Sequence, residues 1–338
     1  MKLVVSICIC AILVLAGISS ADLLIYEGFD YDAGALGGAG SAADDGWGGS
    51  WSVRSDDGRS VQVLSGGLTF GSLPVTGGSL RLQTNLTNGS DRYNRAARAV
   101  DPGGEVLGTV WHSHLLHVEP VKRTLDNREL VTSPIESMDS RWEARVDLDS
   151  TGDTARTGSP DIAGFAGKRD GGAQGRLVVA GNSQGADGDA IALDTTYMVL
   201  GKVEGLGGTD QVTIMVEDPD TGAMVEEDGY RYSATMWVLS EANFAALVGS
   251  GWDESVLDTE RVQFATRTVE TTELVSFSDQ DWVQIHTRDW STTGFSPVYD
   301  EIRFGTTLDA VSIPEPATLA LMAIGATAIL KRSRRRQM

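Results

Sequence analysis

Oxygen-bearing side chains with the spacing of a calcium-binding loop occur once in the middle of the chain. They occupy loop positions 1, 3, 5 and 7 and belong to Asp147, Asp149, Thr151 and Asp153. Calcium takes carboxylate and other oxygen ligands, and a glycine at position 6 permits the sharp turn that such a loop needs. Position 12 is Gly158, where a bidentate glutamate is needed for tight binding. The loop is therefore a candidate for a weak calcium site, and an acidic turn without a cation is the other interpretation.

Tryptophan residues are the second group that could contact a ligand, because an exposed indole ring stacks on the face of a sugar. The chain has 8 tryptophans. Trp111, Trp142 and Trp237 lie within predicted strands, where burial in the core is the usual fate of this side chain. Trp252 and Trp290 lie near predicted loops, so these two residues are our ligand-binding candidates.

Histidines and paired acids give weaker indications of catalysis. His112 and His114 lie two residues apart on a predicted strand, so their rings share one face, as in some zinc sites. A catalytic zinc needs three protein ligands, and a polar strand face is the alternative. Glu143 and Asp147 could supply two carboxylates for glycoside hydrolysis, but solvated strand positions explain them better. We expect a protein that is not an enzyme.

The segments that must position these residues are short strands, because polar and apolar residues alternate with period two between glycine-rich turns. One segment departs from this pattern, since Ser240 can cap a short helix over 240–248 that has Phe244 and Leu247 on one side. About a dozen strands with one helix predict an all-β, two-sheet antiparallel sandwich. The predicted strands are 23–30, 61–63, 80–82, 93–98, 106–118, 142–148, 176–180, 196–203, 211–216, 235–239, 261–264, 273–277, 282–286 and 298–304.

The composition excludes several classes of function. The chain of 338 residues is 41% hydrophobic and 22% charged, which is typical of a globular protein. Its formal net charge is -20, and because the basic tail lies at the end, the central part is still more acidic. Such a surface repels nucleic acids and anionic membranes. Both cysteines, Cys8 and Cys10, lie near the amino terminus, so we expect neither a disulfide framework nor thiol catalysis.

The amino terminus has the three parts of a secretory signal peptide over residues 1–21. Lys2 is the positive end, Leu3–Ile18 is the apolar region, and small residues precede the expected cleavage between Ala21 and Asp22. An uncleaved anchor helix is the alternative. The mature chain is therefore expected to begin outside the cytoplasm.

Several motifs in the middle of the chain resemble a known fold family. They are Tyr26–Tyr31 with Gly46–Trp51, then Met236–Val238, and finally Tyr299–Thr307. Together they resemble the concanavalin A-like or laminin-G-like jelly rolls of exported bacterial proteins. The resemblance implies one jelly-roll domain over residues 22–311. Such motifs occupy fold positions, so the resemblance names no ligand.

The carboxyl terminus carries a second and more specific resemblance. A Pro-Glu-Pro triplet, a short apolar run and a basic end follow in order, beginning with Pro314, Glu315 and Pro316. Residues 312–338 resemble the PEP-CTERM sorting signal. The resemblance implies a membrane-embedded exosortase that recognises the triplet and removes the tail, and it implies an association with exopolysaccharide production.

The length of the apolar run agrees with a temporary membrane anchor. Ala317–Leu330 would form a single hydrophobic helix of about 21 Å, which is short of a hydrocarbon core of about 30 Å. The basic residues after it are expected to stay cytoplasmic, and this orientation leaves the acidic domain outside.

The sequence thus predicts an exported surface or extracellular-matrix protein that is anchored by its tail before processing. Its expected role is non-enzymatic adhesion or weak carbohydrate binding. The expected partners are an exosortase-type enzyme, transiently the membrane, and an extracellular polysaccharide. A purely structural matrix component is one alternative, and a polysaccharide hydrolase or lyase with unrecognised acidic residues is the other.

Overall fold

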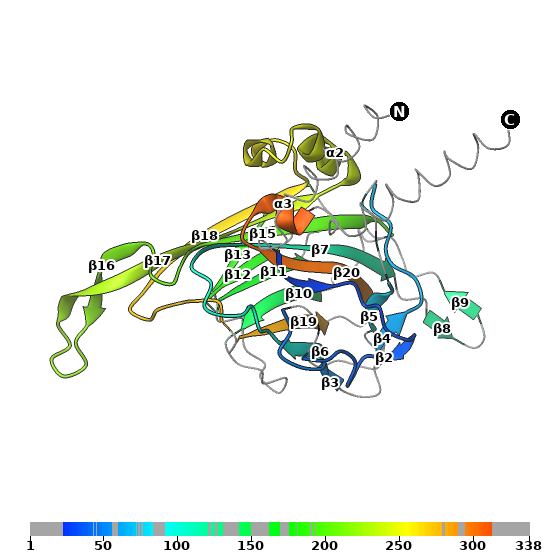
Figure 1. The fold of residues 1–338 in the computed structure, drawn as a ribbon, viewed down its shortest axis with the longest axis horizontal. Helices are drawn as coiled ribbons and strands as arrows, with labels where there is room; N and C mark the ends of the chain where they lie inside the picture. Colours follow the sequence, from blue (N-terminus) through cyan, green and yellow to red (C-terminus); the bar gives the residue numbers. More distant parts are fainter. Residues whose placement is uncertain are drawn as a thin grey trace, which may run out of the picture.

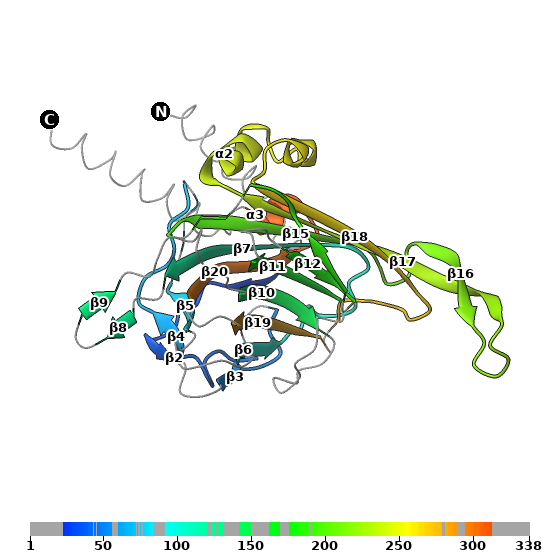
Figure 2. The same cartoon turned by 180° about the vertical axis from the view of Figure 1, so that it is seen from behind.

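Strands dominate the part of the chain that the computed structural model describes. Two antiparallel sheets pack against each other, and a helical layer covers one of them (Figures 1 and 2). The described residues are 23–312 with gaps at 43, 45, 56–59, 72, 74, 76, 84–91, 121–122, 126–127, 131–141, 150–161, 170–175, 181, 190, 193, 279–280 and 290–294.

The larger sheet, sheet A, has 11 strands in the order β14-β18-β17-β15-β7-β20-β5-β4-β2, with β1 beside β20 and β16 beside β17. Its centre is formed by long antiparallel pairs, which β7 makes with both β15 and β20. The strands are β1 (Leu23–Glu27), β2 (Gly34–Ala35), β4 (Ser60–Leu64), β5 (Ser79–Gln83), β7 (Gly108–Pro120), β14 (Asp187–Gly188), β15 (Thr196–Leu206), β16 (Gln211–Glu217), β17 (Met224–Leu239), β18 (Gln263–Thr271) and β20 (Phe295–Gly305).

The smaller sheet, sheet C, has 7 strands in the order β13-β12-β11-β10-β19-β6-β3. A separate two-stranded ribbon consists of β8 (Arg123–Leu125) and β9 (Arg128–Leu130). The strands of sheet C are β3 (Ser52–Ser55), β6 (Arg92–Ala99), β10 (Trp142–Asp149), β11 (Ala163–Arg169), β12 (Arg176–Val179), β13 (Asn182–Gly185) and β19 (Trp282–Asp289).

The helix predicted after Ser240 is present as α2 (Glu241–Gly249). The Ser240 side chain accepts a hydrogen bond from the backbone of Asn243, whose side chain bonds back to Ser240, so each satisfies an otherwise unpaired donor. A 3₁₀ turn, η3 (Glu254–Asp258), and a short helix, α3 (Leu308–Ser312), were not predicted. The strand predicted over 273–277 is wrong, because only an isolated bridge forms there.

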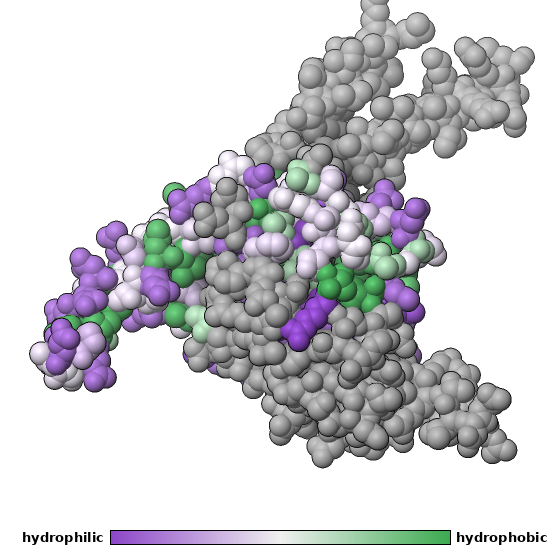
Figure 3. All heavy atoms as spheres, turned by 90° about the horizontal axis from the view of Figure 1, so that it is seen from below, coloured by the Kyte–Doolittle hydropathy of each residue, from purple (hydrophilic) through white to green (hydrophobic). Residues whose placement is uncertain are grey.

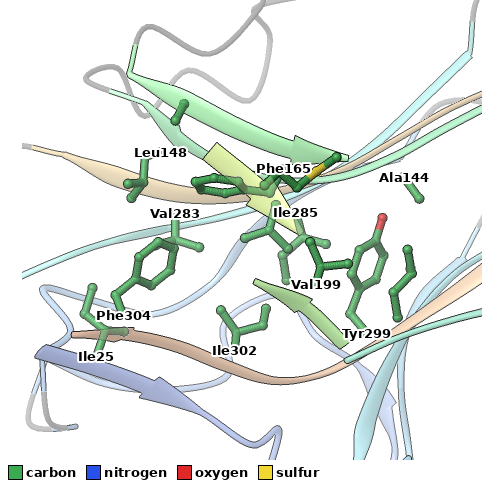
Figure 4. Packing of buried hydrophobic residues seen from close by; sticks show 14 of the residues in the cluster. Ile25, Ala144, Leu148, Phe165, Val199, Val283, Ile285, Tyr299, Ile302 and Phe304 are labelled. Atoms are coloured by element: carbon green, nitrogen blue, oxygen red, sulfur yellow. The ribbon is translucent and has the colours of Figure 1, made fainter. Parts of the chain in front are cut away.

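The main core lies between the two sheets, where alternate residues of the facing strands point inward. In Figure 4, Phe165 and Ile285 from sheet C lie against Val199, Ile302 and Phe304 from sheet A. Burial of aliphatic and aromatic side chains of this size contributes about 1.5–3 kcal/mol each. The prediction of an all-β, two-sheet antiparallel sandwich is confirmed.

A second apolar layer lies on the other face of sheet A, beneath α2. Trp111 and Trp237 stack there with ring centroids 5.8 Å apart, and Phe244 and Leu247 of α2 pack in the same cluster. The expectation that these two tryptophans belong to the core is therefore confirmed. Only the backbone of Trp142 is described, so the expectation for its side chain stays a prediction.

The aromatic motif near the amino terminus, Tyr26–Tyr31 with Gly46–Trp51, surrounds a buried ion pair at one end of the core. Arg98 of β6 pairs with Glu27 at 2.6 Å and lies over the ring of Trp47, with 4.4 Å from the guanidinium carbon to the centroid. The indole of Trp51 donates to Glu27 at 3.0 Å. Gly46 has φ +77 and leaves no room for a Cβ, which would lie 1.9 Å from a backbone oxygen. These motif residues therefore serve the fold.

Candidate functional site

The outer face of sheet C carries a row of basic residues in direct cross-strand register. Arg54 of β3 pairs with Arg95 of β6, Arg95 pairs with His286 of β19, and His286 pairs with Arg145 of β10. Residues directly opposite each other in an antiparallel sheet place their side chains on the same face. The four basic residues therefore form one line across four neighbouring strands, which we call the basic row.

The alternation of side chains along each strand determines that the basic row points away from the core. Val146 and Ile285 point into the core between the sheets, so their neighbours Arg145 and His286 point to the opposite face. The row is nevertheless well buried at its centre, since Arg95 is 3%, His286 2% and Arg145 4% exposed. Arg54, on the edge strand β3, is only partly buried. The row is therefore most accessible at the β3 edge.

Arg145 connects the basic row to the next row of the sheet. Its Nε lies 2.7 Å from Asp147 Oδ1 and 3.0 Å from Asp147 Oδ2, and Nη2 donates to His286 Nδ1 at 2.9 Å. A guanidinium group can only donate, so Nδ1 of His286 must carry a lone pair. His286 is therefore neutral, with its proton on Nε2, an atom that is buried as well.

A second polar row runs beside the first. Gln284 is the cross-strand partner of Asp147, and its amide donates to Asp149 Oδ2 at 3.1 Å. These acids partly offset the arginines, so the face combines charged donors with a few anchored carboxylates. Planar guanidinium groups recognise carboxylate, sulfate and phosphate groups through paired hydrogen bonds. The partly exposed end of the row at Arg54 is therefore the part suited to binding an anion.

The calcium loop predicted from sequence is only partly described. Asp147 and Asp149 belong to strand β10 and not to a loop, and Arg145 already holds the carboxylate of Asp147. Thr151 and Asp153 lie outside the described residues. Within the described ranges, no three His, Cys, Asp or Glu side chains come together as a metal site requires. The calcium site stays a prediction.

Of the two tryptophans predicted to bind a ligand, the structure describes only Trp252. Trp252 is partly buried and packs edge-on against Phe244, with ring centroids 5.8 Å apart, as part of the apolar layer beneath α2. Its ring is therefore engaged in packing, and its φ of +68 places it in a strained turn. Trp290 lies outside the described residues.

The histidine pair considered for zinc lies inside the main core. His112 Nδ1 lies 3.1 Å from the carbonyl of Arg303, and His112 Nε2 lies 2.8 Å from His114 Nδ1. A carbonyl only accepts, so His112 donates through Nδ1 and His114 donates to His112 Nε2. Burial holds the pKa of His112 well below its usual value and lowers the pKa of His114 to about 3. Both rings are neutral packing groups here.

Sequence reasoning missed the basic row as a unit. The alternation in Trp142–Leu148 and Trp282–His286 was recognised, and so was the strand that contains Arg95. The available signal was a basic residue on the polar side of each strand. It could not be used, because nothing in the sequence showed that these strands are neighbours.

Both chain ends implicated in export lie outside the described residues. This applies to the signal-cleavage pair Ala21 and Asp22 and to the sorting triplet Pro314, Glu315 and Pro316. In the part of the chain that the structure describes, no helix is long and apolar enough to cross a membrane.

Comparisons with solved structures return many weak likenesses. Endo-β-1,4-glucuronan lyase from the fungus Trichoderma reesei is 11% identical, with a TM-score of 0.37 over 86% of this chain and 98% of that one. The globular domain of T. cruzi calreticulin is 12% identical, with a TM-score of 0.43 over 86% and 90%. Lectin I from Ulex europaeus is 6% identical, with a TM-score of 0.37 over 83% and 98%. We draw nothing about function from likenesses at this level.

Comparisons of sequence find one motif. No curated protein matches the chain. Residues 312–336 match the PEP-CTERM protein-sorting motif, which covers the triplet, the apolar run and most of the basic end. This motif is a membrane-anchored sorting signal read by an exosortase-type system. The chain is therefore an exported protein that carries a PEP-CTERM sorting motif at its carboxyl terminus.

Proposed function

We propose that the exported domain binds an acidic polysaccharide through the basic row of sheet C, at the cell surface or in the extracellular matrix, and does not turn it over. The observation that carries this proposal is the alignment of Arg54, Arg95, His286 and Arg145 across neighbouring strands. The three arginines of the row are gathered on one sheet face of a chain whose net charge is -20. The acidic remainder repels polyanions, so the row is a favourable place for a polyanion to bind.

The spacing of the row suits an extended polysaccharide. Neighbouring strands lie about 4.8 Å apart, so the row offers a positively charged or hydrogen-bonding group at nearly regular intervals. This interval is close to the length of one pyranose unit in an extended chain. A polymer with a carboxylate on successive sugars can then place one carboxylate at Arg54, while the buried Arg95 on the next strand attracts the neighbouring carboxylate through its charge without contacting it. Its entry point is Arg54, because the row is most exposed there.

The state of His286 supports binding without catalysis. Removal of a proton from a sugar requires a base with a free lone pair near the substrate. Arg145 occupies the Nδ1 lone pair of His286, and in the neutral form Nε2 carries the proton, so neither nitrogen can act as the base. Asp147 is likewise held by Arg145. These groups serve to hold a negative charge.

The test compares a soluble polyuronate with an uncharged glucan of similar length, with binding to the exported protein measured by calorimetry. We expect the polyuronate alone to bind, with an affinity that falls as salt is added. Arg54→Ala should weaken binding roughly tenfold, because it removes one charge-assisted contact of about 1.5 kcal/mol. The matched control is Arg231→Ala, which removes an exposed arginine paired with Glu270 on sheet A. Equal effects of the two variants would refute the assignment.

Turnover is tested in the same samples. After long incubation with the polyuronate, neither new reducing ends nor an unsaturated product should accumulate. Product formation that disappears in His286→Gln would show that the face is catalytic and would overturn the non-enzymatic part of the proposal.

A purely structural role is the second candidate, and the burial of the row favours it. Arg145, Asp147 and His286 already bond to one another at 2–4% exposure. In that case the row would only order the outer face of sheet C, and no polysaccharide would bind in a manner that depends on Arg54.

A further inference from the structure

A two-stranded arm projects from the edge of sheet A (Figures 1 and 2). It consists of β16, the turn after it and the first part of β17, residues 211–229. The second part of β17 pairs with β18 and β15 inside sheet A, so a single long strand joins the arm to the body. The arm is therefore held in a fixed direction by the sheet itself.

Pairing of the arm is incomplete. Within the described residues, β16 pairs only with β17, and Met224–Gly229 of β17 pair only with β16. A two-stranded ribbon is marginally stable in water, and a third strand adds stability. The free edge of β16 presents a row of backbone donors and acceptors that can template another strand.

The sequence of β16 lacks the usual protections of an exposed edge. Gln211–Glu217 contains no proline and no lysine, the residues that commonly prevent strands from pairing at an edge. Val212, Ile214 and Val216 alternate on one face and are only partly buried. On the other face, Met215 is 54% exposed. These features favour strand addition.

The charge of the arm selects the partner. Its acidic residues make the free end hydrophilic, as Figure 3 shows, while no lysine or arginine occurs between Lys202 and Arg231. A second copy of this acidic chain would be repelled, whereas a cationic segment would be attracted. The acidic residues of the arm are Glu217, Asp218, Asp220, Glu226, Glu227 and Asp228, and Asp210 directly precedes it.

We propose that the arm binds an extended, basic segment of another protein, which pairs with the free edge of β16. Backbone hydrogen bonds supply the affinity and the acidic side chains supply the choice of partner, as in other cases of strand addition. Glu217 of β16 lies on the same face as Met215, so a cationic side chain of the added strand can meet this carboxylate beside an apolar contact. Glu226 and Asp228 lie on that face one strand farther away, two strand spacings or about 10 Å from the added strand, and attract its cations through their charge.

The probe is a labelled peptide in which lysine and valine alternate, and the control peptide has glutamate in place of lysine. We expect the exported protein to bind only the basic peptide, as measured by fluorescence anisotropy, and to bind it less tightly as salt is added. Glu226→Lys with Asp228→Lys should weaken binding about tenfold or more. The matched control places the same charges on exposed acids of the body, Glu105→Lys with Glu241→Lys. Thermal unfolding of both variants shows whether the fold is retained.

Hydrogen exchange separates strand addition from a loose attraction of charges. The bound peptide should slow the exchange of amides in β16 and leave those of α2 unchanged. Three results would overturn the proposal. They are equal binding of both peptides, equal weakening by the arm and body variants, and absence of protection in β16. Self-association of the protein that the arm variant abolishes would also overturn it, because the partner would then be a second copy.

Discussion

The two outer faces of the sandwich are built by the same alternation of residues but completed in opposite ways. On sheet A the outward positions are apolar, and α2 covers them with Phe244 and Leu247. On sheet C the outward positions are polar, and arginine, histidine, aspartate and glutamine bond to one another there. Alternation alone therefore does not say whether an outward face is a second core or a site.

The two faces differ in how much their burial contributes to the free energy of folding. The apolar face of sheet A gains free energy when it is covered, so its role is stability. A buried ion pair gains little over an apolar pair of the same volume, because both charges must be desolvated. The charges of sheet C are therefore poorly explained by stability, and this is the reason to connect them with a ligand.

The largest expected effect is on the apolar face. Phe244→Ala removes a side chain that packs against Phe70 and Trp252, and we expect a loss of about 3–5 kcal/mol in the free energy of unfolding. Denaturant titration measures it. Val248→Ala, at an exposed position of the same helix, should change the free energy by no more than about 0.5 kcal/mol. Affinity for a polyuronate should be unchanged in both, and a parallel loss of affinity would contradict the separation of the two faces.

The next effect is on the ion pair of sheet C. Arg145→Leu should destabilise the protein by about 3 kcal/mol, because it removes the cation that holds the buried Asp147. The double variant Arg145→Leu with Asp147→Leu should recover most of that loss, since no charge is then stranded. If the face is a site, the double variant regains stability but not affinity. Recovery of both would assign the pair to structure alone.

The core histidines predict a loss of stability in acid. The pKa of His114 falls from 6.5 to about 3 on folding, so below pH 6.5 the unfolded chain binds a proton that the native protein does not. Stability should therefore fall by about 1.4 kcal/mol per pH unit between pH 6.5 and 3 for this residue. Denaturant titrations over that range should show a shallower slope for His114→Phe than for the unsubstituted chain.

Asp300 changes the pH dependence of stability in the opposite direction, and it is present in both the unsubstituted chain and His114→Phe. Burial raises the pKa of this carboxyl to about 8, so its contribution to stability is present at low pH and is lost as the pH rises from about 4 to 8. The difference between the two slopes therefore isolates His114. Equal slopes would show that the histidine is not held neutral.

The smallest expected effect concerns the cap of α2. Ser240→Ala removes the acceptor for the Asn243 backbone and should cost about 1 kcal/mol. Thermal unfolding should shift downward slightly, while the affinity for a polyuronate stays constant. A loss of affinity would mean that the helical layer and sheet C are coupled.

Local features of the fold could be predicted from sequence because they depend on neighbouring residues. The cap at Ser240 and the strand over Trp142–Leu148 are examples, and both are present. The first half of β17 was missed, because Glu226, Glu227 and Asp228 interrupt the apolar alternation of a strand that is exposed on the arm. The strand predicted over 273–277 failed since its alternation has no neighbouring strand to pair with among the described residues.

The sequence by itself determined the sorting signal and which residues of a strand share a face. The Pro-Glu-Pro triplet with its apolar and basic flanks is a linear signal, so no fold is needed to recognise it. Period-two alternation likewise shows which residues share a face of one strand. These properties are local.

Only the tertiary structure decided which strands became neighbours. Arg54, Arg95, Arg145 and His286 belong to four segments far apart in sequence, and the register of sheet C aligns them. The same packing turned His112 and His114 inward as a neutral pair. Strand order depends on how segments that are distant in sequence pack to bury both sheets, so it cannot be read from any single segment.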